Sequence, residues 1–237
     1  MTTHHRPTDT DGDSEGLGNA SANGSPYARA LGDRIDELHP RLRTYFATIP
    51  AGHIGVGHGV FERAGVPQRW LRPLVRLVEP LGVAFGGFEH EVPFRIVNRT
   101  VDGRALAQRD FHLRGRVWTM GDTVSLAPTG RLVDSLGRFG TVVAAFDVDV
   151  RGGALRLDSR AVGVRAGLFR LRLPSFVAPR ISLTERFDDP DDRDGSDGDT
   201  ADGQQHVDLT VTLPLLGTIY EYAGSFTYRI ERTEQHT

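Results

Sequence analysis

Residues 92–114 read VPFRIVNRTVDGRALAQRDFHLR, and this stretch decides the fold. Apolar and polar residues alternate on both sides of Asp102-Gly103. Alternation indicates a strand with one buried face, and Asp-Gly between two such runs is the strongest short-range signal for a β-hairpin. The stretch therefore predicts two antiparallel strands, 92–98 and 104–114.

The same period continues to the end of the chain. Further strands are expected over 123–127, 131–136, 141–150, 154–164, 181–187, 207–213 and 217–230. About nine strands thus follow one another with no helix between them, which argues against parallel βαβ units and dinucleotide-binding folds. Because open sheet edges invite aggregation, we expect the meander to curl. The predicted fold is mainly β, either an antiparallel up-and-down, lipocalin-like barrel or a strongly curved sheet.

Two or three short helices are expected before the strands. Ser25-Pro26 has the pattern of an N-cap followed by proline, and Pro40 divides the helical pattern into segments 27–38 and 40–47. A third helix is expected to open at Pro67; a basic amphipathic helix can lie on a membrane, but one this short more often packs on its own domain. Residues 50–65 are rich in glycine but lack the spacing of a phosphate-binding loop, so we expect a loop or a bulged strand.

The chain is predicted to form a single β-rich domain over 25–232, with a helical part over 25–80 and the barrel over 90–232. Residues 1–24 are polar and are expected to form a disordered tail. The acidic segment 188–204 is expected to be a disordered loop between two strands. The chain has no cysteine, no secretory signal and no apolar run of ~20 residues, so a cytoplasmic protein without a transmembrane segment is expected.

Charge is unevenly distributed along the chain. All 28 basic residues are arginine, and the tail and the acidic segment together hold 12 of the 31 acidic residues but only two of the arginines. The remaining body has 26 arginines and 19 acids. These arginines are scattered rather than grouped in a basic block, so nucleic-acid binding is not expected. No cofactor motif is present, and the histidines lack the spacing of a metal site.

Several polar side chains fall on the apolar faces of the predicted strands. Residues two apart share a face, so Arg109 lies among Ala107 and Phe111. In the same way Asp134 lies between apolar residues of 131–136, and Glu185 lies between apolar residues of 181–187. The last strand places Tyr220 and Tyr222 on one face.

Two interpretations of this mixed face remain open. In the first, Arg109 forms a buried ion pair with Asp134 or Glu185 and fixes the strand register, since buried charge is costly unless it is paired. In the second, the charged groups and the tyrosines line a cavity and orient the polar end of a ligand.

The sequence resembles a bacterial family known as domain of unknown function 4166, from about Ala30 to Tyr228. The matching pieces are Leu38-His39-Pro40, Arg109 with Phe111, Leu132-Val133-Asp134 with Gly137, Gly152-Gly153 with Leu155, Leu173-Pro174 with Pro179 and Glu185, and Leu213-Pro214 through Gly217, Tyr222 and Gly224. The family usually has glutamate at the position of Asp134, and often tryptophan at that of Ala107, a loss for which Trp118 could substitute.

The resemblance implies no known reaction. Members of the family occur alone or fused behind dehydrogenase-like or epimerase-like domains.

Three functions are therefore considered. The first is a non-catalytic barrel that binds a small apolar or amphipathic ligand, whose polar or anionic end is held by Arg109 and the tyrosines. The second is an enzyme that uses Glu185 or Asp134 as a general acid or base with Tyr222. The third is an interaction module for a dehydrogenase-like partner, with a filled barrel and an exposed apolar patch near Trp70 and Leu74. The expected ligand-binding residues are Arg109, Phe111, Asp134, Glu185, Tyr220, Tyr222 and Trp118.

Overall fold

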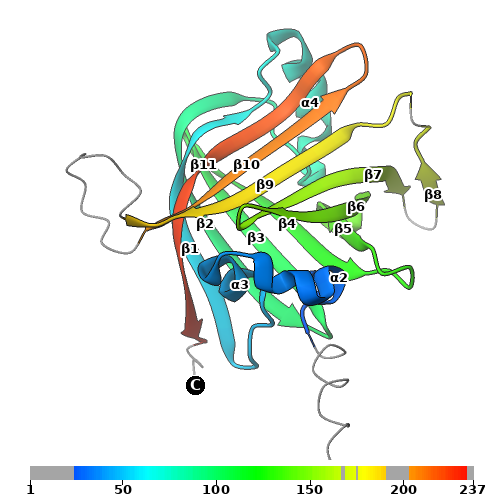
Figure 1. Ribbon diagram of the computed structural model, residues 1–237. Coiled ribbons are helices and arrows are strands. Elements are labelled where there is room, and N and C mark those ends of the chain that lie inside the picture. Colours follow the sequence, from blue (N-terminus) through cyan, green and yellow to red (C-terminus); the bar gives the residue numbers. More distant parts are fainter. Residues whose placement is uncertain (1–23, 167–168, 175, 191–202, 234–237) are drawn as a thin grey trace, which may run out of the picture.

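The computed structural model describes residues 24–166, 169–174, 176–190 and 203–233. Its main feature is an antiparallel barrel of ten strands, which closes because β6 pairs with β7 (Figure 1). Neighbours in the barrel are mostly neighbours in sequence, so the topology is up-and-down, as predicted. The strands are β1 (His53–Gly65), β2 (Phe88–Val101), β3 (Arg104–Leu113), β4 (Arg116–Leu126), β5 (Leu132–Leu136), β6 (Val142–Arg151), β7 (Ala154–Ala166), β9 (Arg180–Asp188), β10 (Gln204–Leu213) and β11 (Gly217–Arg232), with β8 (Phe169–Arg172) as an extra strand beside β7.

The expected number of about nine strands falls short of the barrel's ten because the glycine-rich segment is itself a strand. β1 pairs with both β2 and β11 and carries a bulge at Phe61/Arg63. Of the two structures expected for this segment, a loop or a bulged strand, the bulged strand is therefore confirmed. The expected strand 123–127 was also too short, because β4 begins seven residues earlier, at Arg116.

The glycines of β1 make room for aromatic side chains on β11. Gly57 and Gly59 lie opposite Tyr228 and Phe226 in the pairing. A Cβ added to Gly59 would lie 2.1 Å from the carbonyl oxygen of Ser225 and 2.5 Å from Cβ of Phe226. Real Cβ atoms do not approach backbone this closely, so β1 and β11 can pair in this register only with glycine at this position.

We expect Gly59→Ala to lower the free energy of unfolding by about 1–3 kcal/mol or more, because overpacking displaces backbone. Gly121→Ala is the matched control, since its added Cβ would meet nothing closer than 3.9 Å. Urea denaturation of both variants measures the difference. Equal stabilities would contradict this account of β1.

The helices lie at the two ends of the barrel (Figure 1). At one end, α2 (Pro26–Leu31), η1 (Gly32–Glu37) and α3 (Pro40–Phe46) occupy the predicted positions, and Ser25 caps α2 by accepting a 3.1 Å hydrogen bond from the Ala28 amide. The expected helix 27–38 is divided at Gly32, whose φ of 57° ends the α-helix. At the other end, η2 (Arg69–Leu71), α4 (Arg72–Val78) and η3 (Glu79–Leu81) form the third helical segment.

The residues expected to be disordered fall largely outside the described part of the chain. This applies to residues 1–23 of the tail and to residues 191–202 of the acidic segment. Within the described ranges, the helices are all too short or too polar to cross a lipid bilayer.

The barrel interior is packed in one half and hollow in the other. Aromatic rings fill the half formed by β1, β2 and β3, where Phe61 stacks on Phe94 at 3.8 Å and also contacts Phe111. Phe85, which follows α4, inserts among Phe111, Trp118 and Tyr220 from the end of the barrel. The remaining half contains a cavity.

Candidate functional site

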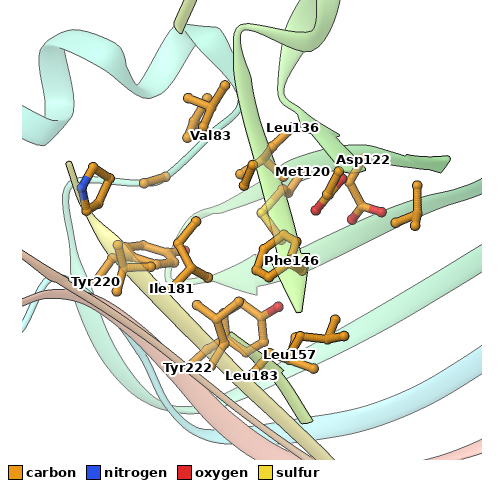
Figure 2. A pocket seen from close by; sticks show the side chains of 18 of the residues that line it. Val83, Met120, Asp122, Leu136, Phe146, Leu157, Ile181, Leu183, Tyr220 and Tyr222 are labelled. Carbon is orange, nitrogen blue, oxygen red and sulfur yellow. The ribbon is translucent and has the colours of Figure 1, made fainter. Parts of the chain in front are cut away.

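The cavity has a volume of about 280 Å³ and extends between the two sets of helices. Tyr27 of α2 and Phe46 of α3 line one end, and Val75 and Val78 of α4 line the other. Figure 2 shows the side chains of its middle part, including Met120, Asp122, Phe146, Leu157, Leu183, Tyr220 and Tyr222. Most of the lining is apolar, and the charged groups gather toward the end formed by α2 and α3.

Three neighbouring strands position a row of charged side chains in the cavity wall. Arg109 of β3 lies opposite Met120 of β4, so it is diagonal to Asp122. Asp134 of β5 lies opposite Val124 of β4 and is therefore diagonal to Asp122 from the other side. Diagonal neighbours on adjacent strands are within reach of long side chains. All three residues line the cavity.

The ion-pair partner of Arg109 is Asp122, and the expectation of Asp134 or Glu185 is wrong. The Arg109 guanidinium donates through Nη1 to Oδ2 of Asp122, and both side chains are nearly buried. Cross-strand geometry explains the choice, because Asp122 is the carboxylate on the strand adjacent to Arg109. Asp134 lies one strand further on, and Glu185 comes from β9 in a different part of the wall.

Two further polar groups face this row. Glu185 is buried and accepts a hydrogen bond from the side-chain amide of Gln205, on the adjacent strand β10. Tyr222 of β11 is also buried, and it lines the same cavity as the charged row. The cavity thus brings together five of the seven residues expected to bind a ligand: Arg109, Asp134, Glu185, Tyr220 and Tyr222.

Burial changes the ionisation of the carboxyl groups in this cluster. It raises the pKa of Asp134 to about 8, and the nearby negative charge of Asp122 adds to the effect. It also raises the pKa of Glu185 to about 7, although Arg109 and the Gln205 amide oppose the shift. Burial likewise raises the pKa of the Tyr222 hydroxyl to about 12. Near neutral pH the site therefore contains protonated or partly protonated carboxyls beside one ion pair.

Two buried oxygens of the cavity lining lack a hydrogen-bond partner among the described residues: Oδ1 of Asp134 and the hydroxyl of Tyr220. The first belongs to the charged row. Among the described residues, no group donates to Oδ1 of Asp134 or accepts from it, although this atom is buried. Buried polar atoms are nearly always hydrogen-bonded, and each exception calls for an explanation. Because Asp134 lines the cavity, a molecule bound there can supply the missing partner.

Two of the expected site residues lie elsewhere in the barrel. Phe111 and Trp118 do not line the cavity but contact each other, at 5.4 Å between ring centroids, in the packed aromatic half. Asp122, in contrast, was missed because the predicted strand began one residue after it. Residues 116–126 alternate apolar and polar, and this period places Trp118, Met120, Asp122 and Val124 on one face, so the signal was present in the sequence.

The comparisons with known proteins identify a family but no characterised relative. Residues 38–226 match the model of the family described as Domain of unknown function (DUF4166). The match runs from just before α3 into β11 and includes every charged residue of the cavity wall. Neither the curated proteins nor the solved structures gave a match. In the part of the chain that the structure describes, no three His, Asp or Glu side chains are placed to hold a metal ion.

Proposed function

This chain belongs to the family described as domain of unknown function (DUF4166), and we propose that it binds a small amphipathic ligand in the cavity of its barrel. The apolar part of the ligand packs against the valine, leucine and phenylalanine side chains of the wall. Its polar end lies at the cluster of Asp134, Glu185 and Tyr222. The observation that carries this proposal is the partnerless Oδ1 of Asp134, in the wall of an otherwise apolar cavity.

The size of the cavity supports a ligand rather than a packing defect. Protein interiors are close-packed, with few voids larger than a water molecule. A cavity of about 280 Å³ is therefore much larger than an ordinary packing defect. The volume is close to the lower end of the range of ~300–1,000 Å³ that is typical of small-molecule sites.

The charges of the cluster favour a polar end that donates hydrogen bonds. Arg109 is already neutralised by Asp122, so it offers little net attraction to an anion. Asp134 and Glu185 add two carboxyls. A hydroxyl or amine suits this environment better than the anionic end considered from the sequence. Either group can donate a hydrogen bond to Oδ1 of Asp134, and an ammonium is also attracted to a partly ionised Glu185. An anionic end gains less, because Arg109, the cation among the described residues of the lining, is already paired.

Displacement of a fluorescent probe tests this preference. N-phenyl-1-naphthylamine is the probe, and 1-decanol, decylamine and decanoate are the competitors. We expect decanol and decylamine to displace the probe about tenfold more effectively than decanoate at pH 7.5. This ratio corresponds to a difference of about 1.4 kcal/mol in binding free energy between the polar ends. Stronger displacement by decanoate would overturn the assignment of the polar end.

The pH dependence of stability gives an independent test of the carboxyls. Asp134 and Glu185 keep their protons up to pKa values of about 8 and 7 in the folded protein, whereas ordinary Asp and Glu ionise near pH 4 when unfolded. Between these limits the folded state binds more protons than the unfolded state. The free energy of unfolding therefore falls as the pH rises from about 4 to about 8.

We expect Asp134→Asn to weaken this pH dependence, because it removes one of the groups that must stay protonated. Its melting temperature should fall less than that of the wild type between about pH 5 and pH 8, and should exceed the wild-type value at pH 8. Thermal unfolding followed by circular dichroism measures the effect, with Asp33→Asn on the surface of η1 as the control. Parallel pH profiles of Asp134→Asn and the wild type would contradict the assignment.

A second candidate function is supported by the pKa of Glu185. A value of about 7 suits a general acid or base at neutral pH, and perturbed carboxyls are frequent in active sites. An enzyme of this kind would convert its ligand, so Glu185→Gln would accumulate substrate. Native mass spectrometry then distinguishes the two functions: a ligand of the same mass in both proteins supports binding alone, and a different mass in Glu185→Gln supports catalysis.

The interaction module for a dehydrogenase-like partner receives less support. It required a filled barrel, whereas half of the barrel is hollow. Its other requirement was an exposed apolar patch near Trp70 and Leu74, and both of these side chains are exposed. A cytoplasmic location, expected from the sequence, stays a prediction.

A further inference from the structure

One end of the barrel exposes large apolar side chains from three segments that are far apart in sequence. The first segment is the helical one over 69–81, where Trp70 is 58% exposed and Leu77 is 78% exposed. The second is the turn between β10 and β11, with Leu215 and Leu216. The third is β8 with its connection to β9, where Leu171, Phe176 and Val177 are exposed. We call these residues, together with Leu74, Val78 and Leu81, the apolar rim.

The three segments lie together around one end of the cavity. The side chain of Gln68 donates hydrogen bonds to the carbonyl oxygens of Leu216 and Thr218, which ties the β10–β11 turn to the start of the helical segment. Val75 and Val78 of α4 line the cavity jointly with Pro179, from the β8–β9 connection. Figure 1 shows α4 and the β10–β11 turn at the top of the barrel, away from α2 and α3, and β8 projecting at its right side.

The cavity approaches the surface at this rim. Val78 is part of the cavity lining and is also 43% exposed to solvent. A ligand could therefore enter between α4 and the β8–β9 connection. At the opposite end, Tyr27 and Phe46 cover the cavity with the side chains of α2 and α3.

Charge distinguishes the apolar rim from the other end of the molecule. Residues 64–78 contain Arg69, Arg72 and Arg76 and no acidic residue, and residues 161–184 contain four arginines and no acidic residue. Glu79 lies within the rim segment, between Val78 and Leu81, but its side chain is mostly buried and paired with Arg116. The α2–α3 end, in contrast, carries ion pairs of mixed charge, such as Arg34 with Glu37 and Arg43 with Asp36.

We propose that the apolar rim docks the barrel onto an anionic lipid membrane, with which the cavity exchanges its ligand. Exposed Trp and Leu side chains interleaved with arginine are characteristic of segments that lie in the membrane interface. Arginines near an anionic bilayer are attracted to its negative surface potential. Patches of this kind on a monomer mark interaction sites. The exchange of ligand rests on the function proposed above, whereas docking can be measured on its own.

Tryptophan fluorescence reports docking directly. The chain has two tryptophans, of which Trp118 is buried and Trp70 is exposed. Vesicles of phosphatidylglycerol and phosphatidylcholine should shift the emission to shorter wavelength, and Trp70→Phe should abolish the shift. Binding should weaken severalfold when the salt concentration rises from about 0.1 to about 0.5 M, because salt screens the arginines. Vesicles of phosphatidylcholine alone should bind more weakly.

Matched variants separate the rim from the rest of the surface. Leu77→Ser should reduce vesicle affinity about tenfold, because it removes a side chain that becomes buried on docking. Val101→Ser, at an exposed position in the β2–β3 hairpin near the other end, should leave it unchanged. Ala144→Phe, which fills the cavity, should bind vesicles like the wild type, so a failure of docking and a failure of ligand binding are distinguishable.

Two results would overturn the proposal. One is the absence of binding to anionic vesicles by the wild type. The other is equal vesicle affinity of Leu77→Ser and the wild type. A dimer in solution that Leu77→Ser dissociates, without vesicle binding by the wild type, would assign the apolar rim to a second copy of the chain instead.

Discussion

Arg109→Ala is expected to destabilise the protein by about 3–5 kcal/mol, the usual cost of leaving one partner of a buried ion pair alone. Asp122 would then remain as an unpaired carboxylate in a wall that also holds Asp134 and Glu185. Equilibrium unfolding in urea, followed by circular dichroism, measures the loss.

Two further variants test whether the loss of stability in Arg109→Ala comes from leaving a buried charge unpaired. Arg63→Ala removes an exposed partner of Asp208, at 3.1 Å, and of Glu221, at 3.4 Å, and should cost no more than about 1 kcal/mol. The double variant Arg109→Met/Asp122→Leu removes both charges and should recover most of the stability lost by Arg109→Ala, since apolar replacements of a buried pair are often neutral. An equal loss in free energy of unfolding for Arg109→Ala and Arg63→Ala would contradict a stabilising role of the buried pair between β3 and β4.

Ala144→Phe is expected to abolish ligand binding, with a loss of about a hundredfold or more in probe affinity, because its ring would occupy the cavity. Ala144, the third residue of β6, lines the cavity and is buried. A larger side chain here has empty space to enter, so the fold should survive. Titration with N-phenyl-1-naphthylamine measures the affinity, at a tenfold change per 1.4 kcal/mol of binding free energy.

The control for this variant is the next residue of the same strand. Successive side chains of a strand point to opposite faces, so Ala145→Phe adds the same ring outside the barrel. It should bind the probe like the wild type, and both variants should show a cooperative thermal transition. Unchanged affinity in Ala144→Phe would place the probe elsewhere than in the cavity.

The period of the sequence predicted most of the barrel, because alternation and hairpin turns are local signals. Asp102-Gly103 sits between β2 and β3, and Gly152-Gly153 sits between β6 and β7. β1 was harder to predict, since its glycines provide no apolar alternation. The aromatic rings of β11 require glycine at these positions, and β11 lies more than 150 residues away in sequence.

The sequence predicted three charged residues on the inner face of the barrel, but it did not predict how they pair and it missed Asp122. Alternation alone placed Arg109, Asp134 and Glu185 inside the barrel, where the structure has them. The choice of Asp122 as the partner of Arg109 depends on which strands are adjacent and in which register, and a face assignment does not contain that information. The division of the interior into a packed and a hollow half depends on where Phe85 inserts, which is a tertiary property.

Native mass spectrometry of the protein purified from cells, with Ala144→Phe alongside, tests the central claim most directly. The account predicts a small amphipathic molecule bound to the wild type and absent from Ala144→Phe, although both proteins are folded. A wild type that carries no small molecule and takes up none when decanol is added, or an equal amount of the same molecule on both proteins, would contradict the claim that this cavity is the ligand site.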